Sequence, residues 1–381
     1  MCGSFSTICR RSASWITPMR DLPPPPAPIA LLAELTHRCP LACPYCSNPL
    51  ELAARDVEMD TATWARVFTE AAELGVLQLH LSGGEPASRR DLEELVAAAR
   101  ATDLYVNLIT SGIGLTEARL DALEAAGLDH VQLSLQGVRA GTADRIGGYR
   151  GGFDRKLTVA RAITARGLPL TVNAVMHRQN LDDLAATIEF AAELGARRVE
   201  VACVQFYGWA LANRAALLPT RAQVDAAKRT VADAVATYRG RMAIDFVPPD
   251  YYADFPKACM GGWASTGLNV TPDGTVLPCH AAATIPDLTF QRVTEASLTE
   301  IWERGPAFQA FRGHDWMQEP CRSCARREID HGGCRCQAMA LAGDPYATDP
   351  VCRYARHRPE VDAVLDALPD AEALPELVYR R

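Results

Sequence analysis

The sequence predicts an α/β protein in two parts: six strand–helix units that build a parallel sheet, then a domain rich in cysteine. The first observation is that short apolar runs alternate with longer amphipathic stretches from residue 29 to about residue 247. Such alternation is typical of a parallel sheet with right-handed crossovers. The second is that the alternation stops after Pro248, where seven of the 13 cysteines lie between residues 259 and 352. Six units are fewer than the eight that close a barrel, so we expect a partial barrel.

The expected strands and helices follow from these runs and from the signals at their ends. Asp60 is placed to cap the first helix, because a carboxylate accepts hydrogen bonds from the free amides at a helix start. Glycine follows four helices, at positions 75, 127, 167 and 195, where it adopts the left-handed conformation easily. We expect strands over residues 29–35, 76–81, 104–109, 130–135, 170–175 and 198–204, and helices over residues 61–74, 92–101, 117–126, 154–166 and 181–194.

The chain divides into four segments in this prediction. Residues 1–28 form a proline-rich extension, because the prolines at 23–26 and Pro28 favour extended or polyproline II backbone. Met19 is an alternative translation start, and the two cysteines before it fit no ligand motif. The partial barrel is expected over residues 29–247, the cysteine-rich domain over residues 248–360, and a helical tail over residues 361–381.

Charge and composition exclude several classes of protein. The formal net charge of −7 and the pI near 5.7 argue against a nucleic-acid-binding surface. No apolar run approaches the roughly 20 residues that span a bilayer, and the first residues lack the apolar core of a secretion signal. The odd number and the clustering of the cysteines indicate metal binding rather than disulfides. We therefore expect no nucleic-acid or membrane partner, and a reducing compartment such as the cytoplasm.

Cys39, Cys43 and Cys46 form a C-x3-C-x2-C pattern directly after the first expected strand. Thiolates are soft ligands, which suit an iron–sulfur cluster, zinc or Cu(I). Three thiols in one loop leave a fourth ligand position unfilled. On a 4Fe–4S cluster, one iron would stay open to a ligand that is not protein. A zinc site would instead need a fourth side chain from elsewhere, because four ligands are the norm for zinc.

The cysteine spacing, the aromatic Tyr45 and the downstream run Ser82-Gly83-Gly84-Glu85-Pro86 resemble the radical S-adenosylmethionine (radical SAM) superfamily. The resemblance implies a partial (β/α)6 barrel in which SAM chelates the open iron of a 4Fe–4S cluster and is cleaved to a 5′-deoxyadenosyl radical. It also implies that Tyr45 and residues 83–86 contact SAM, the two glycines by letting the backbone approach closely. Both motifs then lie at the carboxyl ends of strands, where barrels of this type place their chemistry.

Further candidates lie at the ends of later strands. Ser134 and Asn173 interrupt apolar strands from which this family often contacts SAM, and the alternative is a buried side chain that hydrogen-bonds the backbone or water. Tyr207 and Trp209 follow the sixth strand and are candidates for a peptide pocket at the barrel mouth. Cys203 stands alone in a strand and is expected in the core.

The cysteines beyond Pro248 come in separate groups. Asp273-Gly274 between β-forming residues predicts a hairpin, which would bring Cys259 and Cys279 together. The remaining cysteines resemble the SPASM domain, which carries two auxiliary iron–sulfur clusters, and Asp330 occupies a position where that domain usually has cysteine. An aspartate ligand would shift the potential of its cluster. The resemblance implies one cluster, nearer the barrel, on Cys259, Cys279, Cys334 and Cys336, and an outer one on Cys321, Cys324, Asp330 and Cys352.

Some features of these auxiliary sites stay open at the level of sequence. Each cluster is either 2Fe–2S or 4Fe–4S. The alternative for Asp330 is a solvated loop residue, with an open or water-bound iron in its place. His280, His314 and His331 lie near the cysteines, although the ligand count is complete without them.

Four stretches together resemble one family more closely, the PqqA peptide cyclases of pyrroloquinoline quinone biosynthesis: residues 39–49, 207–220, 259–263 and 332–338. The resemblance implies a carbon–carbon crosslink between a glutamate γ-carbon and a tyrosine ring in the precursor peptide PqqA. It also implies the peptide chaperone PqqD and a flavodoxin-like reductant as partners. The alternatives are a SPASM-type enzyme that modifies another peptide or protein, and a zinc-ribbon interaction module fused to an α/β domain.

Overall fold

The computed structural model describes residues 25–370 and 373–380, so most of the expected proline-rich extension lies outside the described residues. The described chain forms a sheet in the order β7-β6-β5-β4-β3-β2-β1-β8-β9. Every pairing from β7 to β8 is parallel, and β9 is antiparallel to β8. The strands are β1 (Ala30–Thr36), β2 (Gln78–Gly83), β3 (Tyr105–Thr110), β4 (His130–Ser134), β5 (Leu170–Met176), β6 (Arg198–Cys203), β7 (Ala243–Val247), β8 (Gly267–Val270) and β9 (Val276–Leu277).

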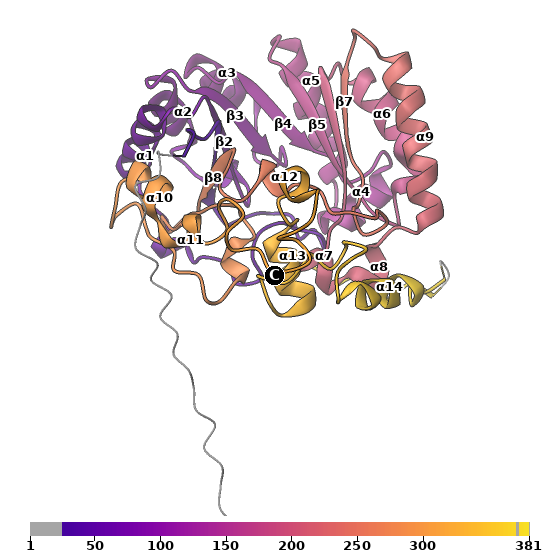
Figure 1. Ribbon diagram of the computed structural model, residues 1–381. Helices are drawn as coiled ribbons and strands as arrows, with labels where there is room; N and C mark the ends of the chain where they lie inside the picture. The colour runs from indigo at the N-terminus through magenta and orange to yellow at the C-terminus, as the bar shows by residue number, and fades with distance from the viewer. Residues whose placement is uncertain (1–24, 371–372, 381) are drawn as a thin grey trace, which may run out of the picture.

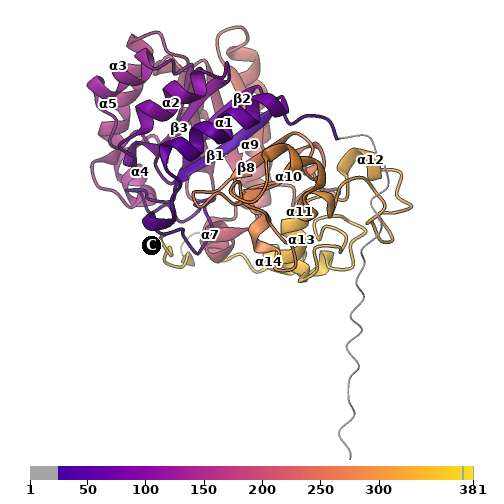
Figure 2. The same ribbon diagram turned by 90° about the vertical axis from the view of Figure 1, so that its left-hand side faces the viewer.

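The crossover helices lie on the outer side of the curved sheet, as Figures 1 and 2 show. The side chain of Asp60 accepts a hydrogen bond from the amide of Thr63 at the start of α1, and Gly75 ends that helix with a φ of +99°, so both predicted end signals are confirmed. These helices are α1 (Thr61–Leu74), α2 (Leu92–Arg100), α3 (Glu117–Ala125), α5 (Gly152–Ala165), α6 (Leu184–Glu193) and α9 (Arg221–Thr237).

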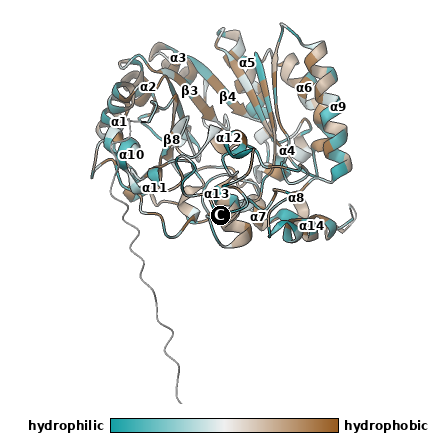
Figure 3. Cartoon of the chain, in the orientation of Figure 1, coloured by the Kyte–Doolittle hydropathy of each residue, from teal (hydrophilic) through white to brown (hydrophobic). Residues whose placement is uncertain are grey.

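One hydrophobic core runs from the strands of the barrel into the C-terminal part. It includes Leu31 and Leu79 on neighbouring strands, Trp64 on α1 and Trp302 on α10 (Leu298–Arg304), all fully or almost fully buried. Figure 3 shows the strands β3 and β4 as largely hydrophobic, whereas much of α9 and of α14 (Arg358–Asp366) is hydrophilic. Burial of the strands against the helices is what stabilises the parallel sheet. No described helix combines the length and the apolar composition that crossing a membrane requires.

The C-terminal part lies beside the barrel and also completes its sheet. The Asp273-Gly274 turn is confirmed, with Gly274 at a φ of +85°, but the hairpin it makes continues the barrel sheet because β8 pairs with β1. The remaining helices of the structure are short: α4 (Ala140–Gly147), α7 (Gly208–Ala212), α8 (Arg214–Leu217), α10 (Leu298–Arg304), α11 (Pro306–Gln309), α12 (Arg327–Asp330), α13 (Arg335–Ala342) and α14 (Arg358–Asp366).

Several elements differ from the sequence prediction. The seventh parallel strand, β7, and the helix α9 before it were not expected, and they extend the sheet beyond six units. The tail predicted as helical from residue 361 is helical only to Asp366. The described residues after 373 have no regular structure and run back toward the barrel, where side chains and backbone hold them with hydrogen bonds.

Candidate active site

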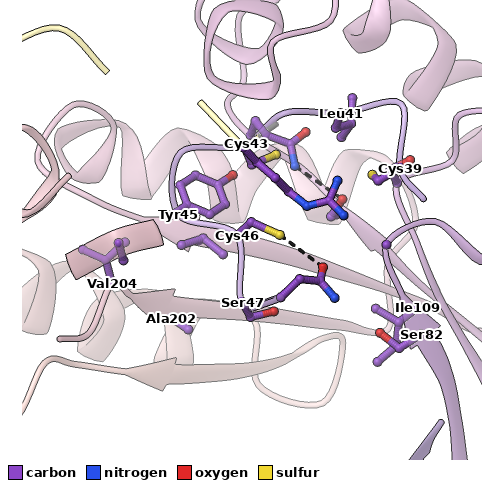
Figure 4. Close-up of a pocket in the computed structure, with 18 of the residues that line it drawn as sticks. Cys39, Leu41, Cys43, Tyr45, Cys46, Ser47, Ser82, Ile109, Ala202 and Val204 are labelled. Carbon is purple, nitrogen blue, oxygen red and sulfur yellow. Dashed lines mark hydrogen bonds between the residues drawn. The ribbon is translucent and has the colours of Figure 1, made fainter. Parts of the chain in front are cut away.

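The three cysteines of the C-x3-C-x2-C pattern lie on the loop that follows β1, around a shared space (Figure 4). They line a cavity of about 320 Å³ together with the carboxyl ends of several strands. Ser82 and Ile109 face the loop from one side, and Ala202 and Val204 border it on the other. The thiol of Cys46 donates to the side-chain oxygen of Asn48 at 3.2 Å. The expected position of this motif at the carboxyl edge of the sheet is therefore what the structure shows.

Gly83 and Gly84 fix the end of β2 against the cysteine loop. A Cβ at Gly83 would overlap the carbonyl oxygen of Thr36, and one at Gly84 would overlap that of Arg38. The amide of Glu85 donates to the Arg38 carbonyl at 2.7 Å, so the two segments meet through backbone. Both glycines also line the cavity. Their lack of a Cβ thus serves the chain's own packing, in addition to any ligand.

Glu85 does not line the cavity but positions residues that do. Its carboxylate is fully buried and accepts from the amide of Ala87 at 2.9 Å, the hydroxyl of Thr110 at 2.7 Å and the amide of Ser111 at 2.6 Å. Thr110 and Ser111 both line the cavity. Glu85 therefore holds the end of β3 in place, and its oxygens are occupied by these bonds.

The other predicted SAM contacts divide into two groups. Tyr45 and Ser134 line the cavity, whereas Pro86 and Asn173 do not. Within the described residues the buried hydroxyl of Tyr45 has no hydrogen-bond partner, and its ring lies 5.5 Å from the ring of His177. A buried polar atom without a partner is costly. The Tyr45 hydroxyl lies beside the side chains of Gln136 and Cys43, so it borders the cysteine loop.

Burial governs the acidity of the three thiols. It raises the pKa of Cys39 to about 11 and that of Cys43 to about 12, and it also raises the pKa of Cys46. Bound metal would replace these protons, since the thiolate is the ligand. No group of three or more His, Cys, Asp or Glu side chains in the described part of the chain is arranged to bind a single metal ion. In a 4Fe–4S cluster each cysteine binds a different iron, so the donor set fits a cluster.

Several cavity residues were not singled out from the sequence. Gln136, Gln205 and Arg380 line the cavity beside Thr110 and Ser111. A polar pair that directly follows an apolar strand was a signal that would have found Thr110 and Ser111. No local pattern marks Arg380, because it comes from the far end of the chain.

Tyr207 connects the cavity to the C-terminal cysteines. It lines the cavity, and its hydroxyl lies 2.9 Å from Nε2 of His280, the residue that follows Cys279. Burial raises the pKa of Tyr207 and lowers that of His280. Trp209, the other candidate for a peptide pocket, is buried and does not line the cavity. His280 is thus a hydrogen-bond partner of a cavity residue.

The four cysteines predicted to hold the inner cluster come together from three places in the sequence. The sulfurs of Cys279 and Cys336 lie 3.7 Å apart. The thiols of Cys259 and Cys336 lie next to the sulfur of Cys334 and lower its pKa. The described cysteines, these four included, are all free thiols. Four converging thiols are a donor set that fits an iron–sulfur cluster.

The four outer candidates also share one pocket, lined by Cys321, Cys324, Asp330 and Cys352. Asp330 is only 8% exposed, so it is not a solvated loop residue. Its carboxylate accepts from Nε of Arg326 at 3.3 Å and from the amide of Gly332 at 3.1 Å. The structure thus brings the four predicted side chains, three thiols and the carboxylate of Asp330, into one pocket.

Asp349, which was not a sequence candidate, lies between the two auxiliary groups. It is fully buried and accepts from the amide of Cys334 at 2.7 Å and from Nε2 of Gln337 at 2.9 Å. It also lines the outer pocket. Burial raises its pKa to about 7. One carboxylate therefore contacts the inner group and borders the outer group.

Comparison with known proteins places this fold and these sites in a class. Residues 33–191 match the model of the radical SAM superfamily, and residues 259–325 match the SPASM iron–sulfur cluster-binding domain. Streptococcus suis SuiB bound to S-adenosylmethionine has the same fold, with a TM-score of 0.72 and 21% identity over 86% of this chain and 78% of that chain. For anSMEcpe with bound AdoMet the TM-score is 0.62, with 16% identity over 88% and 96% of the two chains. Fold and site together define a radical SAM enzyme with a SPASM domain, for which SAM and iron–sulfur clusters are the cofactors.

Close relatives narrow this class to a family. A PqqA peptide cyclase from Ruegeria pomeroyi is 69% identical over 356 residues, which cover 93% of this chain and 95% of that protein. A PqqA peptide cyclase from Rhizobium meliloti is 61% identical over 346 residues, 91% of either chain. The chain belongs to the PqqA peptide cyclase family.

Proposed function

We propose that this chain forms a carbon–carbon bond between the γ-carbon of a glutamate and the ring of a tyrosine in the peptide PqqA. The family membership supports PqqA as the substrate. The overall change in the peptide is the loss of two hydrogens. One leaves the γ-carbon as a hydrogen atom, and the other leaves the tyrosine ring as one electron and one proton once the new bond has formed.

The proposal assigns the cavity beside the cysteine loop to the first of these losses. Cys39, Cys43 and Cys46 would hold a 4Fe–4S cluster, and this cluster with SAM supplies abstraction of a hydrogen atom from an unactivated carbon. Tyr45, Gly83, Gly84 and Ser134 would contact SAM from the cavity wall. Glu85 would act indirectly through Thr110 and Ser111, and Pro86 and Asn173 through the packing of their strands.

The second loss is assigned to the C-terminal part, where two auxiliary clusters would accept the electron. Cys259, Cys279, Cys334 and Cys336 would bind the inner one, and Cys321, Cys324, Asp330 and Cys352 the outer one. The observation that carries the proposal is the hydrogen bond between Tyr207, which lines the cavity, and His280, which follows Cys279. The tyrosine ring of a peptide held in the cavity would then lie nearer to the inner cysteine group than to the outer one.

The chain's own residues would also exclude water from the cavity, because apolar side chains form much of its wall, among them Leu41, Ile109, Val175 and Val204. We further propose that PqqD presents PqqA to this cavity and that a flavodoxin-like protein supplies the electron that starts each turnover.

Mass spectrometry of PqqA tests the proposal directly. The reconstituted protein is incubated anaerobically with PqqA, PqqD, SAM and a reductant. We expect 5′-deoxyadenosine together with a peptide that has lost two hydrogens and carries a glutamate–tyrosine linkage. If 5′-deoxyadenosine forms and PqqA stays unmodified, the assigned substrate or partner is wrong. If neither product forms from protein that contains its clusters, the assigned reaction is wrong.

A further inference from the structure

The segment 378–380 is fastened onto the cysteine loop by side chains from elsewhere in the fold. Asn213 is buried, and its side-chain oxygen accepts from the amide of Val378 at 2.7 Å. Its side-chain nitrogen donates to the carbonyl of Val378 at 2.8 Å and to that of Pro44, inside the cysteine loop, at 2.9 Å. The hydroxyl of Tyr379 donates to the carbonyl of Arg145 at 2.9 Å. One asparagine therefore ties this segment directly to the cysteine loop.

Arg380 continues from this anchor into the cavity. Its amide donates to the carbonyl of Ala42 at 3.1 Å, and its guanidinium donates to the carbonyl of His37. The residue is only 7% exposed, and Nε has no hydrogen-bond partner among the described residues. An unpartnered N–H of a buried cation is costly. The backbone amide and the guanidinium of Arg380 thus hold the two ends of the loop from 37 to 42, and Nε is left without a partner among the described residues.

Arg380 is also the one charged side chain among the described residues that line the cavity. The other lining groups are thiols, hydroxyls, amides, backbone and apolar side chains. The cation lies close enough to lower the pKa of Cys39 and Cys46, against the larger effect of burial. A charge at such a buried position acts more strongly than one at the surface. Arg380 is thus the only cation in the described cavity wall, and it comes from a segment more than 330 residues away in sequence. A second cation, the buried Lys156, lies behind the wall, where it donates to the carbonyl of Ser134 at 2.8 Å and lowers the pKa of Cys43.

We propose that Arg380 is a positioning residue that sets the potential of the cluster on Cys39, Cys43 and Cys46, with residues 378–380 holding it in place. Reduction adds a negative charge to the cluster, and a nearby buried cation favours the reduced form, since net charge and hydrogen bonds near a cluster set its potential. Arg380 thereby makes the cluster easier to reduce. This inference rests on the three cysteines as cluster ligands, and it does not depend on PqqA as the substrate.

The test is a redox titration of the anaerobically reconstituted, full-length holoenzyme, followed by electron paramagnetic resonance. The signal to follow is the one that disappears in Cys43→Ala. Arg380→Gln is expected to shift the midpoint potential of that signal to a more negative value, whereas Arg380→Lys, which keeps the charge, stays near the wild type. The matched control is Arg356→Gln, an exposed arginine outside the cavity, which should leave the potential unchanged.

A second variant and a binding measurement keep the test decisive. Asn213→Ala loosens the anchor and leaves Arg380 in the chain, so it is expected to give a smaller shift in the same direction. If Arg380→Gln and Arg356→Gln have the same potential, the inference is overturned. It is also overturned if Arg380→Gln weakens SAM binding without moving the potential, because the guanidinium then serves as an anion site. If every cluster signal survives in Cys43→Ala, the ligand assignment fails together with the inference.

Discussion

The cysteine loop of the barrel and the cysteine groups of the C-terminal part are built in opposite ways. Cys39, Cys43 and Cys46 come from eight consecutive residues, and their mutual proximity follows from the chain itself. The inner group joins residues from 259 to 336, which meet because the segment after β9 packs against α13. Local spacing therefore defines the first site, and tertiary structure defines the second.

The residues that hold each site in place follow the opposite pattern to the cysteines themselves. The local motif depends on distant residues, since Gly84, Asn213 and Arg380 all hold the cysteine loop through its backbone. The dispersed groups depend on near neighbours: Asp349 contacts Cys334 within 15 residues, and Arg326 pairs with Asp330 four residues away. A motif that is compact in sequence is thus not self-sufficient in structure.

The largest expected effect comes from removing one cysteine of the barrel loop. Cys43→Ala is expected to abolish 5′-deoxyadenosine formation, because the cluster would lose one of its three protein ligands. The measurement is chromatography of the nucleoside after incubation with SAM and dithionite. Cys203→Ala is the matched control for cluster assembly, since Cys203 also lines the cavity but is a buried core cysteine. Equal iron loss in both variants would contradict the assignment.

The next largest expected effect distinguishes the roles of the two C-terminal cysteine groups. Cys336→Ala disrupts the inner group, which borders the Tyr207–His280 contact, and is expected to stop crosslinking of PqqA while 5′-deoxyadenosine still forms. Cys352→Ala disrupts the outer group and should retain more crosslinked peptide than Cys336→Ala. The ratio of crosslinked peptide to 5′-deoxyadenosine, measured by mass spectrometry, compares them. A lower ratio for Cys352→Ala would reverse the assigned order of the groups.

Acid should lower the free energy of unfolding of the barrel through protonation of His177 in the unfolded chain. This histidine is fully buried against Tyr45, and burial, with a smaller effect of Arg145, lowers its pKa from 6.5 to about 3. The unfolded chain then binds a proton that the folded chain does not, so stability is complete above pH 6.5 and is lost as the pH falls below it. Between pH 7.5 and 5.5 the loss through this residue is about 1.4 kcal/mol.

Denaturant unfolding of the anaerobic holoenzyme at these two pH values measures that loss. His177→Gln removes the titrating group, so the free energy of unfolding should fall less with acid than in the wild type. His357→Gln is the control, because His357 lies on the partly exposed start of α14. An identical acid dependence of wild type and His177→Gln would show that another group controls the acid response.

The smallest expected effect tests the contact between the two regions. Tyr207→Phe removes the hydrogen bond to His280, which is worth about 1 kcal/mol, and should lower the ratio of crosslinked peptide to 5′-deoxyadenosine roughly fivefold. Tyr252→Phe is matched to it, because it loses a hydrogen bond to the carbonyl of Pro219 away from the cavity. Equal ratios in the two variants would exclude a role of the Tyr207–His280 contact in crosslinking.

Sequence reasoning recovered what periodicity and spacing encode. It predicted β1 to β6, the capped α1 and the turn at Gly274, because each depends on residues within a few positions of one another. It missed β7, whose half-exposed residues carry a weak pattern at the side of the sheet. It could not find the pairing of β8 with β1, since parallel register between segments so far apart has no local signal.

The same limit applies within the site. The cysteine pattern and the Gly83-Gly84 run can be recognised from the composition of the sequence alone. Asp349 and Arg380 are ordinary residues in the sequence, and their burial beside ligands depends on how the whole chain folds. Glu85 was expected at the ligand, yet its oxygens are used by Thr110, Ser111 and Ala87. A motif thus identifies the residues that matter more readily than it identifies what each one touches.

The pairing of β8 with β1 limits how these two regions can be separated by engineering. A chain cut near Pro248 would leave one edge of β1, over residues 30–33, without its partner strand, and such an exposed edge is a template for aggregation with other strands. The β8–β9 hairpin leads into the auxiliary cysteine groups, and it therefore also covers the β1 edge of the barrel sheet. Exchange of the C-terminal part between related enzymes should preserve residues 267–277 with the barrel, and a join after β9 is the natural place to make it.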